Sequence, residues 1–197
     1  MIRAALTGNY GSGKSSVLGF FAELGACCLS ADDIVRELLS DPMILQKIRS
    51  AFGGAVFEEG QLQKKKLAAL VFSDPASRCR LESILHPPVL ERIENTVAAC
   101  KGDLAVVEIP LLFECGYEAR FDVAMDVYAD DETALARLEK NGIPRQEAAR
   151  RLQAQLPALE KARRAGIVIN NQGSAKQARW QVDRIYRRLT EAGRERH

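Results

Sequence analysis

The sequence is poor in histidine and has no marked excess of either charge. Its two histidines are His86 and His197, too few for a histidine-rich metal site. The 28 Lys and Arg residues nearly balance the 26 Asp and Glu residues, giving a formal net charge of +2. Because so small a net charge creates no strong overall field, we expect neither nucleic acid nor a membrane as a partner.

Long apolar runs and paired cysteine motifs are also missing. No apolar run approaches the ~18 residues that a membrane helix needs, and the first residues lack the charged-then-apolar pattern of a secretory signal. Five cysteines occur without C-x-x-C spacing, so we expect reduced, mostly buried thiols and a cytoplasmic protein. These cysteines are Cys27, Cys28, Cys79, Cys100 and Cys115.

The apolar pattern predicts an α/β fold with a parallel sheet flanked by helices. Residues 2–7 are typical of a buried strand, residues 14–24 of an amphipathic helix and residues 26–29 of a second buried strand, which together make a βαβ unit. Three further strands are predicted, over residues 104–109, 123–128 and 167–169.

The pattern over residues 32–101 is helical, with no convincing strand. Asp41-Pro42 and Asp74-Pro75 predict helix starts, and Pro87-Pro88 predicts the start of another helix. Later helices are expected over residues 131–140, 144–164 and 174–192, with residues 193–197 frayed.

Residues 8–15 read GNYGSGKS and match the phosphate-loop pattern G-x-x-x-x-G-K-[ST]. They lie between a predicted strand and a predicted helix, so that backbone amides and the helix N-terminus can face phosphate oxygens. Lys14 can bridge the terminal phosphates, and the Ser15 hydroxyl can bind Mg²⁺. The alternative is a glycine-rich turn with an exposed lysine. We therefore predict that this segment binds a nucleoside triphosphate. The predicted nucleotide-binding residues are Gly8, Asn9, Tyr10, Gly11, Ser12, Gly13, Lys14, Ser15 and Ser16.

The kind of phosphate-loop protein follows from what accompanies the loop. No N/T-K-x-D segment is present to recognise guanine, and 197 residues are too few for a motor or a large ATPase. A small-molecule kinase fits best, because it needs only a second pocket, a group that receives the acceptor's proton and a closing lid.

Further motifs follow the phosphate loop along essentially the whole chain. They are Ala31-Asp32 with Ile34-Val35-Arg36, Phe52-Gly53, Gly60-x-Leu62, Leu85-His86-Pro87, residues 109–114 (IPLLFE), Arg151-x-x-x-Gln155 and Val168-Ile169-x-Asn171-x-Gly173. No motif after the phosphate loop is decisive alone, but in their order and spacing they resemble the motifs of the dephospho-CoA kinase family.

The resemblance implies the reaction, the fold and the division of the chain. The γ-phosphoryl group of ATP, bound with Mg²⁺, would pass to the ribose 3′-hydroxyl of dephospho-CoA, giving coenzyme A and ADP. One phosphate-loop kinase domain of three layers is expected, as a monomer or weak homo-oligomer. Its core would comprise residues 1–31, 102–136 and 166–197, with a helical acceptor-binding insertion over about residues 32–101 and a short lid over about residues 137–165.

Asp32 is the residue that the resemblance places at the acceptor hydroxyl. Independently, Asp32 follows the second predicted strand, so it lies at the carboxyl edge of a parallel sheet beside the phosphate loop. A carboxylate there could accept the hydroxyl proton. The alternative is an N-cap for a helix over residues 33–39, although Asp33 is the better cap candidate.

The remaining acceptor candidates also have structural alternatives. Arg36 lies one helical turn after Asp32 and could hold acceptor phosphates or form a surface salt bridge. His86 could line the acceptor pocket or cap the helix at Pro87. The resemblance adds Lys64, Pro110, Leu111 and Leu112 to the acceptor site.

The nucleotide side gains residues from later in the chain. Glu108, at the end of an apolar strand, is a weaker candidate to hold Mg²⁺ through water. Arg137 and Arg151 could reach the β- and γ-phosphates, and we count Arg137 with Asp32 and Lys14 as catalytic. The resemblance places Asn171 and Gly173 at the adenine, whereas other arginines such as Arg145 and Arg164 are expected on solvated helix faces.

Some positions depart from the family pattern, which leaves two other functions open. Asn9 replaces a usual glycine, Ser30 and Gly166 replace usual acids, and Lys64 and Lys140 replace arginines. The chain could therefore phosphorylate another nucleotide-like or small hydroxyl acceptor. It could also be a catalytically weak nucleotide-dependent binding protein that uses its basic last helix.

Overall fold

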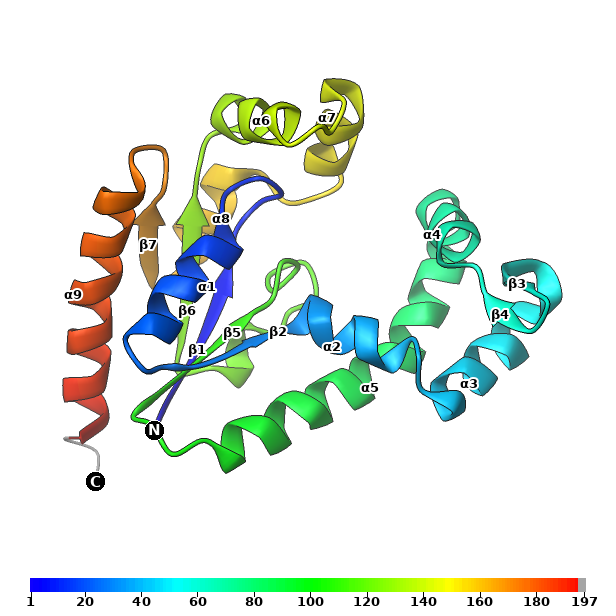
Figure 1. Cartoon of the computed structure of the whole chain (residues 1–197), viewed down its shortest axis with the longest axis horizontal. Helices are drawn as coiled ribbons and strands as arrows, with labels where there is room; N and C mark the ends of the chain where they lie inside the picture. The colour runs from blue at the N-terminus through cyan, green and yellow to red at the C-terminus, as the bar shows by residue number, and fades with distance from the viewer. Residues whose placement is uncertain (195–197) are drawn as a thin grey trace. The chain divides into compact units, whose positions relative to one another are not determined.

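The computed structural model describes residues 1–194 and divides the chain into two compact units (Figure 1). The core unit joins residues 1–30 with the chain from residue 99 onward. The helical unit comprises residues 31–98. The predicted roles of an acceptor-binding insertion and a lid stay predictions.

A five-stranded sheet with every neighbouring pair parallel forms the centre of the core unit (Figure 1). The strand order is β2-β5-β1-β6-β7, so β1 lies in the middle. The predicted parallel sheet flanked by helices is thereby confirmed. The strands are β1 (Ile2–Thr7), β2 (Cys27–Ser30), β5 (Leu104–Glu108), β6 (Val123–Tyr128) and β7 (Ile167–Asn170).

β2 differs from its prediction as a buried strand. It lies at one edge of the sheet, where it pairs with β5 alone, and all of its residues are half-buried. An edge strand leaves part of its surface uncovered, and the apolar run Ala-Cys-Cys-Leu does not reveal that position.

The helices of the core unit cover an apolar centre. α1 and α9 pack against each other and against β1 and β5, while α8 packs against β6. Leu6, Phe21 and Met125 are among the fully buried residues of this centre. The helices are α1 (Lys14–Glu23), α6 (Asp131–Lys140), α7 (Arg145–Gln153), α8 (Ala158–Arg164) and α9 (Ala175–Arg194), with a 3₁₀ turn at Glu118–Arg120.

The helical segment predicted over residues 144–164 is broken into α7 and α8. Pro157 immediately precedes α8, where its fixed φ and missing N–H favour a helix start over a helix interior. The buried residues Leu135, Leu138 and Leu152 pack α6 and α7 together in a small core of their own.

The prediction that residues 193–197 are frayed is wrong for Gly193 and Arg194. Gly193 is buried in the last turn of α9, next to Ile2 and Asp103, and Arg194 forms an ion pair with Asp103 at 3.0 Å. Residues 195–197 lie outside the described residues.

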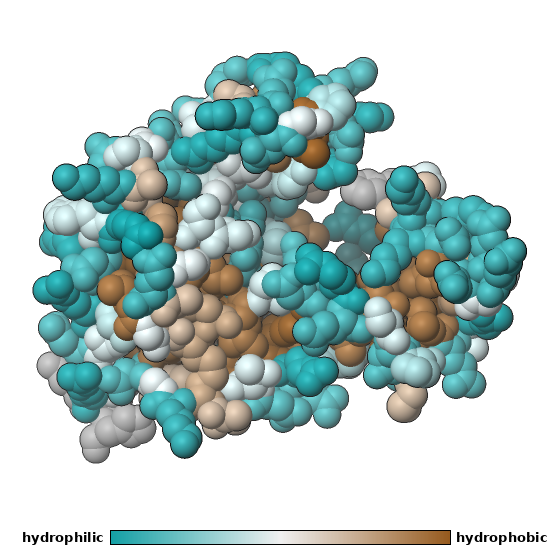
Figure 2. Space-filling view, viewed as in Figure 1, coloured by the Kyte–Doolittle hydropathy of each residue, from teal (hydrophilic) through white to brown (hydrophobic). Residues whose placement is uncertain are grey.

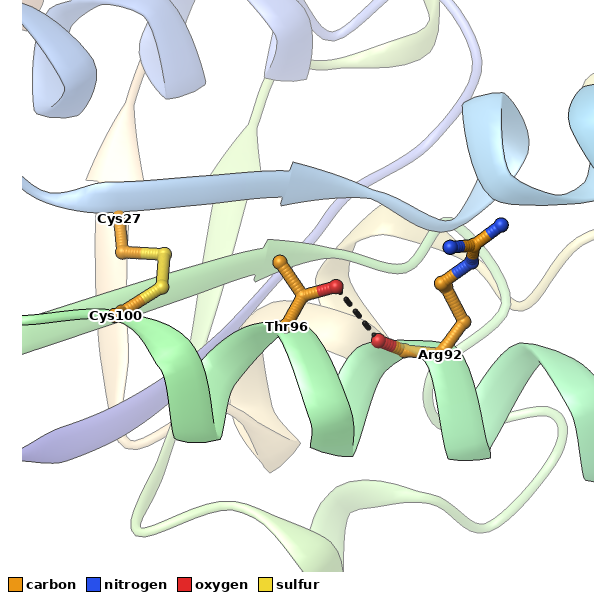
Figure 3. Close-up of a disulfide and its surroundings, with 4 residues drawn as sticks. All are labelled: Cys27, Arg92, Thr96 and Cys100. Atoms are coloured by element: carbon orange, nitrogen blue, oxygen red, sulfur yellow. Dashed lines mark hydrogen bonds between the residues drawn. A yellow bond between two sulfur atoms is a disulfide. The ribbon is translucent and has the colours of Figure 1, made fainter.

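The expectation of reduced thiols is wrong for Cys27 and Cys100, which form a disulfide (Figure 3). Their Cα atoms lie 6.2 Å apart across 73 residues of sequence, because the chain leaving α5 returns beside the edge strand β2. The expectation of burial is also wrong: among the cysteines outside the disulfide, Cys79 is exposed, and Cys28 and Cys115 are half-buried.

The helical unit has a core of its own, formed by Ile44, Ile48, Val56, Leu67 and Leu85. Its elements are α2 (Ala31–Leu38), α3 (Pro42–Phe52), a 3₁₀ turn (Gly53–Val56), β3 (Phe57–Glu58), β4 (Gln61–Leu62), α4 (Lys64–Ser73) and α5 (Pro75–Ala99). The helix starts predicted at Asp41-Pro42 and Asp74-Pro75 are confirmed, because each aspartate accepts amide hydrogen bonds from the first turn of its helix.

Two predictions for the helical unit are wrong. The short antiparallel pair of β3 and β4 was not predicted, since each strand has only two residues; Glu59 and Gly60 make the turn with positive φ. Moreover, α5 runs through Pro87 and Pro88 and does not begin there. Its buried stripe, Leu85, Val89, Ile93 and Val97, continues across the prolines at four-residue spacing, so packing outweighs their local cost.

The outer surface of α6 and α7 is mostly hydrophilic, as Figure 2 shows. Arg145 forms ion pairs there with Glu132 and Glu139, which agrees with the solvated face predicted for it. Among residues 1–194, no helix combines the length and apolar composition that spanning a membrane requires.

Candidate phosphate-binding site

The phosphate loop connects β1 to α1 at the carboxyl end of the central strand. Two of its glycines are required by geometry. A Cβ on Gly8, whose φ is +145°, would lie 2.6 Å from the Val127 carbonyl oxygen. Gly13 has a φ of +90°, and a Cβ there would overlap the side-chain amide of Asn171. Only glycine fits these two positions without moving backbone or buried neighbours.

The start of α1 is arranged for an anion. Gly13 occupies the N-cap position, no side chain caps the helix, and its first turn holds no acidic residue. The N-terminal amides and the positive end of the helix dipole therefore face the loop, and no carboxylate from the helix's own first turn competes for them. Lys14 is buried, with 8% of its surface exposed, and its Nζ donates to the Asn9 carbonyl oxygen at 3.1 Å. The alternative of an exposed lysine in a simple turn is wrong.

Ser15 and Glu108 meet beside the loop. The Ser15 hydroxyl donates to Glu108 Oε1 at 3.3 Å, and Glu108 is 6% exposed at the end of β5. A hydroxyl and a carboxylate are the oxygen ligands that Mg²⁺ accepts, and Mg²⁺ takes its other ligands from water and phosphate. The two residues therefore fit a magnesium ion bound with a nucleotide. Within the described residues, no three His, Cys, Asp or Glu side chains gather into a metal site made by protein alone.

Arg137 joins the loop to the segment after β7. Its guanidinium donates to the carbonyl oxygens of Ser12, at 3.2 Å, and of Asn171, at 2.5 Å. The Asn171 side chain also donates to the Ser12 carbonyl oxygen, at 2.7 Å. The structure therefore brings together two residues that are 34 positions apart in sequence and both predicted for the nucleotide side.

Arg151 reaches the loop from α7. It donates to the Tyr10 hydroxyl at 2.8 Å, its guanidinium lies 5.1 Å from the centre of the Tyr10 ring, and it pairs with Glu147. Of the other predicted nucleotide residues, Ser16 and Gly173 are exposed. Gly173 lies between β7 and α9, next to Gln177.

The predicted acceptor segment after β5 also lies in the core unit. The Pro110 carbonyl oxygen accepts a hydrogen bond from the Thr7 hydroxyl at 3.2 Å. Pro110 and Leu111 are half-buried, whereas the Leu112 side chain is fully buried. The other predicted acceptor residues belong to the helical unit.

Within the helical unit, α2 begins at Ala31, so Asp32 and Asp33 both lie inside its first turn. Neither aspartate therefore stands before the first helical residue, where the cap alternatives placed it. Both are exposed, and Arg36 pairs with Asp33 at 2.6 Å in the predicted surface salt bridge. Lys64 is exposed at the start of α4.

His86 is half-buried within α5, one residue before Pro87. Because α5 is continuous there, His86 does not cap a helix that begins at Pro87.

Two charged residues near the loop are buried, and no pattern in the sequence predicts their burial. Lys161 of α8 is fully buried, although it stands among basic residues that are typical of a solvated face. Asp126 of β6 is 1% exposed, and neither of its carboxylate oxygens has a hydrogen-bond partner in the described chain. Burial raises the pKa of Asp126 to about 7, although the charges of Lys161 and Lys14 act to lower it.

Comparison with known proteins identifies similar sequences over nearly the whole chain. The sequence profile of the dephospho-CoA kinase family matches residues 2–177. A dephospho-CoA kinase of Syntrophotalea carbinolica is 39% identical over 96% of this chain and 92% of its own. One from Deinococcus radiodurans is 40% identical over 95% of this chain and 92% of its own.

Solved structures have the same fold. The crystal structure of TT1252 from Thermus thermophilus is 33% identical, with a TM-score of 0.86 over 95% of this chain and 97% of that one. A dephospho-CoA kinase from Campylobacter jejuni is 26% identical, with a TM-score of 0.68 over 96% of this chain and 98% of that one.

Proposed function

The chain belongs to the dephospho-CoA kinase family and phosphorylates dephospho-CoA with ATP in the last step of coenzyme A synthesis, and we propose which of its residues perform this reaction. The γ-phosphoryl group passes to the ribose 3′-hydroxyl. A bond forms between that oxygen and the γ-phosphorus, the bond from the γ-phosphorus to the bridging oxygen breaks, and ADP leaves.

The phosphate loop holds the triphosphate of ATP. Amides of residues 8–15 and the uncapped start of α1 donate to phosphate oxygens, and Lys14 places its charge at the terminal phosphates. When ATP binds, the Lys14 amine would exchange the Asn9 carbonyl oxygen for a phosphate oxygen, because a lysine ammonium can donate to either acceptor. The geometry of Gly8 and Gly13 supports this assignment.

Ser15 and Glu108 would hold the Mg²⁺ that accompanies ATP, Ser15 directly and Glu108 through water. The bound ion would supply positive charge that neutralises the phosphates. The 3.3 Å contact between the hydroxyl and the carboxylate supports the pairing.

Arg137 stabilises the charge that develops on the transferred group. Its guanidinium has five N–H donors, and in the described chain two of them bind the carbonyl oxygens of Ser12 and Asn171, so donors remain for phosphate oxygens. Arg151 supports the same side of the nucleotide from α7, and Asn171 and Gly173 border the adenine.

Asp32 accepts the proton of the acceptor hydroxyl, and Arg36 and Lys64 bind acceptor phosphates. His86, Pro110, Leu111 and Leu112 border the acceptor. The family relationship, the exposed position of Asp32 in the first turn of α2 and the cationic chemistry of Arg36 and Lys64 support these roles. We keep the cytoplasm as the proposed location on the family relationship alone, because the Cys27–Cys100 disulfide removes the argument from reduced thiols. We also propose a monomer or weak homo-oligomer without a nucleic-acid or membrane partner.

The observation that carries the proposal is a phosphate loop with a buried Lys14 and the Ser15–Glu108 pair in a chain that the family profile matches from residue 2 to 177. Its test is to incubate the purified chain with Mg-ATP and dephospho-CoA and to separate the products. We expect coenzyme A and ADP in equal amounts. ATP binding without coenzyme A formation would contradict the proposal, and a simple polyol supplied as acceptor is the negative control.

A further inference from the structure

We propose that Lys161 is a positioning residue that holds the segment after β5 in register with the phosphate loop. The inference rests on the proposed function, because it concerns how the two substrate-binding segments are kept in place. Nothing in the sequence singles out this lysine, and the loop motif does not include it.

The burial of Lys161 is the first observation. Its side chain is 0% exposed, and its Nζ lies 2.8 Å from the Pro110 carbonyl oxygen and 2.8 Å from Glu114 Oε1. An ammonium removed from water this completely is costly unless its partners are well placed. Both partners belong to the same short segment after β5, so the lysine fixes that segment at two points.

The Pro110 end of the segment leads directly to the phosphate loop. The same Pro110 carbonyl oxygen that binds Lys161 accepts the Thr7 hydroxyl at 3.2 Å. Thr7 is fully buried and is the last residue of β1, immediately before Gly8. One carbonyl oxygen therefore connects Lys161 to the entrance of the loop.

The Glu114 end leads to the loop by a second route. Glu114 Oε1 accepts the Leu156 amide at 3.0 Å, and the Leu156 carbonyl oxygen accepts the side-chain amide of Asn9 at 3.1 Å. Beside it, the Tyr10 amide donates to Gln155 Oε1 at 2.8 Å. Hydrogen bonds, one ion pair and the backbone from Thr7 to Asn9 thus form a closed ring that includes the start of the phosphate loop. Its members are Lys161, Glu114, Leu156, Asn9, Thr7 and Pro110.

This ring lies where position matters for the reaction. Ligands of parallel α/β sheets bind beyond the carboxyl ends of the strands, and the ring joins the segments that leave β1 and β5 there. Since phosphoryl transfer depends on alignment, a shift of about 1 Å between the two segments can cost ~100-fold in rate. Lys161 therefore acts on the reaction through Pro110 and Glu114 and does not itself touch a substrate.

Arg164 on the same helix provides a matched control. It also joins α8 to the chain after β5, through an ion pair with Glu118 and a guanidinium that lies 4.7 Å from the centre of the Phe113 ring. Its side chain is 36% exposed, however, and within the described chain its hydrogen bond goes to Glu118 and not to Pro110, Glu114 or the phosphate loop. A general stabilising link between α8 and that chain would be lost in either variant, whereas the ring is broken only at Lys161.

The test compares Lys161→Met, Glu114→Gln and Arg164→Met with the unaltered enzyme in steady-state assays that vary each substrate separately. We expect Lys161→Met to lower kcat/KM for dephospho-CoA at least about tenfold, while KM for ATP changes less than threefold. Glu114→Gln should lower kcat/KM for dephospho-CoA by a smaller factor, again with little change in KM for ATP. The variant that combines Lys161→Met with Glu114→Gln should lose no more kcat/KM than Lys161→Met alone, because both changes remove the same interaction. Arg164→Met should retain unaltered kinetics.

Hydrogen exchange supplies a readout that does not depend on activity. The Leu156 and Tyr10 amides should exchange faster in Lys161→Met and in Glu114→Gln than in Arg164→Met. If Lys161→Met does not fold, Glu114→Gln carries the test alone, because the neutral amide keeps the side-chain size but replaces the charged acceptor of Leu156 and Lys161 with a weaker one.

The outcomes separate this inference from the proposed function. An unaltered enzyme that makes no coenzyme A overturns the proposed function. An active enzyme whose folded Lys161 and Glu114 variants match it in kcat and both KM values overturns the inference alone. The inference is also overturned if kcat/KM falls equally in Lys161→Met, Glu114→Gln and Arg164→Met, or if the fall is explained entirely by a smaller fraction of folded protein.

Discussion

At the scale of single residues, Lys14 and Asp32 have contrasting environments that suit the roles proposed for them. Lys14 is buried at the start of α1, where its charge has little competition from water, whereas Asp32 is exposed in the first turn of α2. Removing each should therefore damage different steps of the reaction.

Asp32→Asn should lower kcat by about 10²–10⁴-fold, because the proton acceptor is lost, while affinity for ATP changes less than threefold. Lys14→Ala should weaken ATP binding and lower kcat together. Calorimetry with ATP and a coupled ADP assay measure both effects. Asp33→Asn is the control for Asp32, being exposed in the same turn. Unchanged kcat in Asp32→Asn would remove Asp32 from the proposed chemistry.

Asp126 should make folding stability depend on pH. Because burial raises its pKa to about 7 in the folded chain, from about 3.9 in an unfolded one, the folded state binds the extra proton between these values. The free energy of unfolding should therefore fall as pH rises from about 4 to 7, by roughly 3 kcal/mol at most. Asp126→Asn should remove much of this fall, as urea unfolding at pH 5 and pH 8 would detect. Equal slopes in the two proteins would contradict the assignment.

At the scale of elements, α5 shows how tertiary packing overrides local preference. Its interior contains Pro87 and Pro88, each of which removes a backbone donor, yet the buried stripe from Leu85 to Val97 continues across them. Read locally, these prolines predicted a helix start. The structure shows one helix, because the apolar stripe has to remain on one face to be buried.

Pro87→Ala should stabilise the chain by about 1–3 kcal/mol, because alanine restores a helical donor and favours helix. Pro87 is exposed, so the smaller side chain opens no cavity. Urea unfolding measures the change. Glu91→Ala, at another exposed position of α5, should change stability by less than about 0.5 kcal/mol. A loss of stability in Pro87→Ala would mean that the proline is accommodated by a local geometry that alanine cannot use.

At the scale of the whole molecule, the Cys27–Cys100 disulfide closes a loop that contains the entire helical unit. Both cysteines belong to the core unit, so the bond shortens the unfolded chain across 73 residues of sequence. In the chain-entropy view such a closure contributes roughly 4 kcal/mol.

Thiol titration of the denatured, unreduced chain should therefore find Cys28, Cys79 and Cys115, and reduction should expose Cys27 and Cys100 as well. In the folded chain Cys28 should react slowly, since burial raises the pKa of its thiol to about 11. Cys27→Ser should lower the unfolding midpoint, whereas Cys79→Ser, at an exposed free thiol, should leave it unchanged. Five reactive thiols before reduction would contradict the disulfide.

The sequence by itself determined the features that are encoded locally. The phosphate loop, β1, β6 and the helix starts at Asp41 and Asp74 follow from glycine spacing, apolar runs and capping residues, all of which act within a few residues. The order of the motifs also predicted the family and its reaction, because the motifs keep the same residue types at the same spacing.

Only the tertiary structure decided which distant residues meet and which lie inside. β2 lies at an edge of the sheet, and Cys27 pairs with Cys100. Lys161 is buried, although the same helix also contains Arg163 and Arg164. α5 also continues through its prolines. Burial and pairing depend on neighbours that are far away in the chain, whereas composition and periodicity report only on neighbours along it.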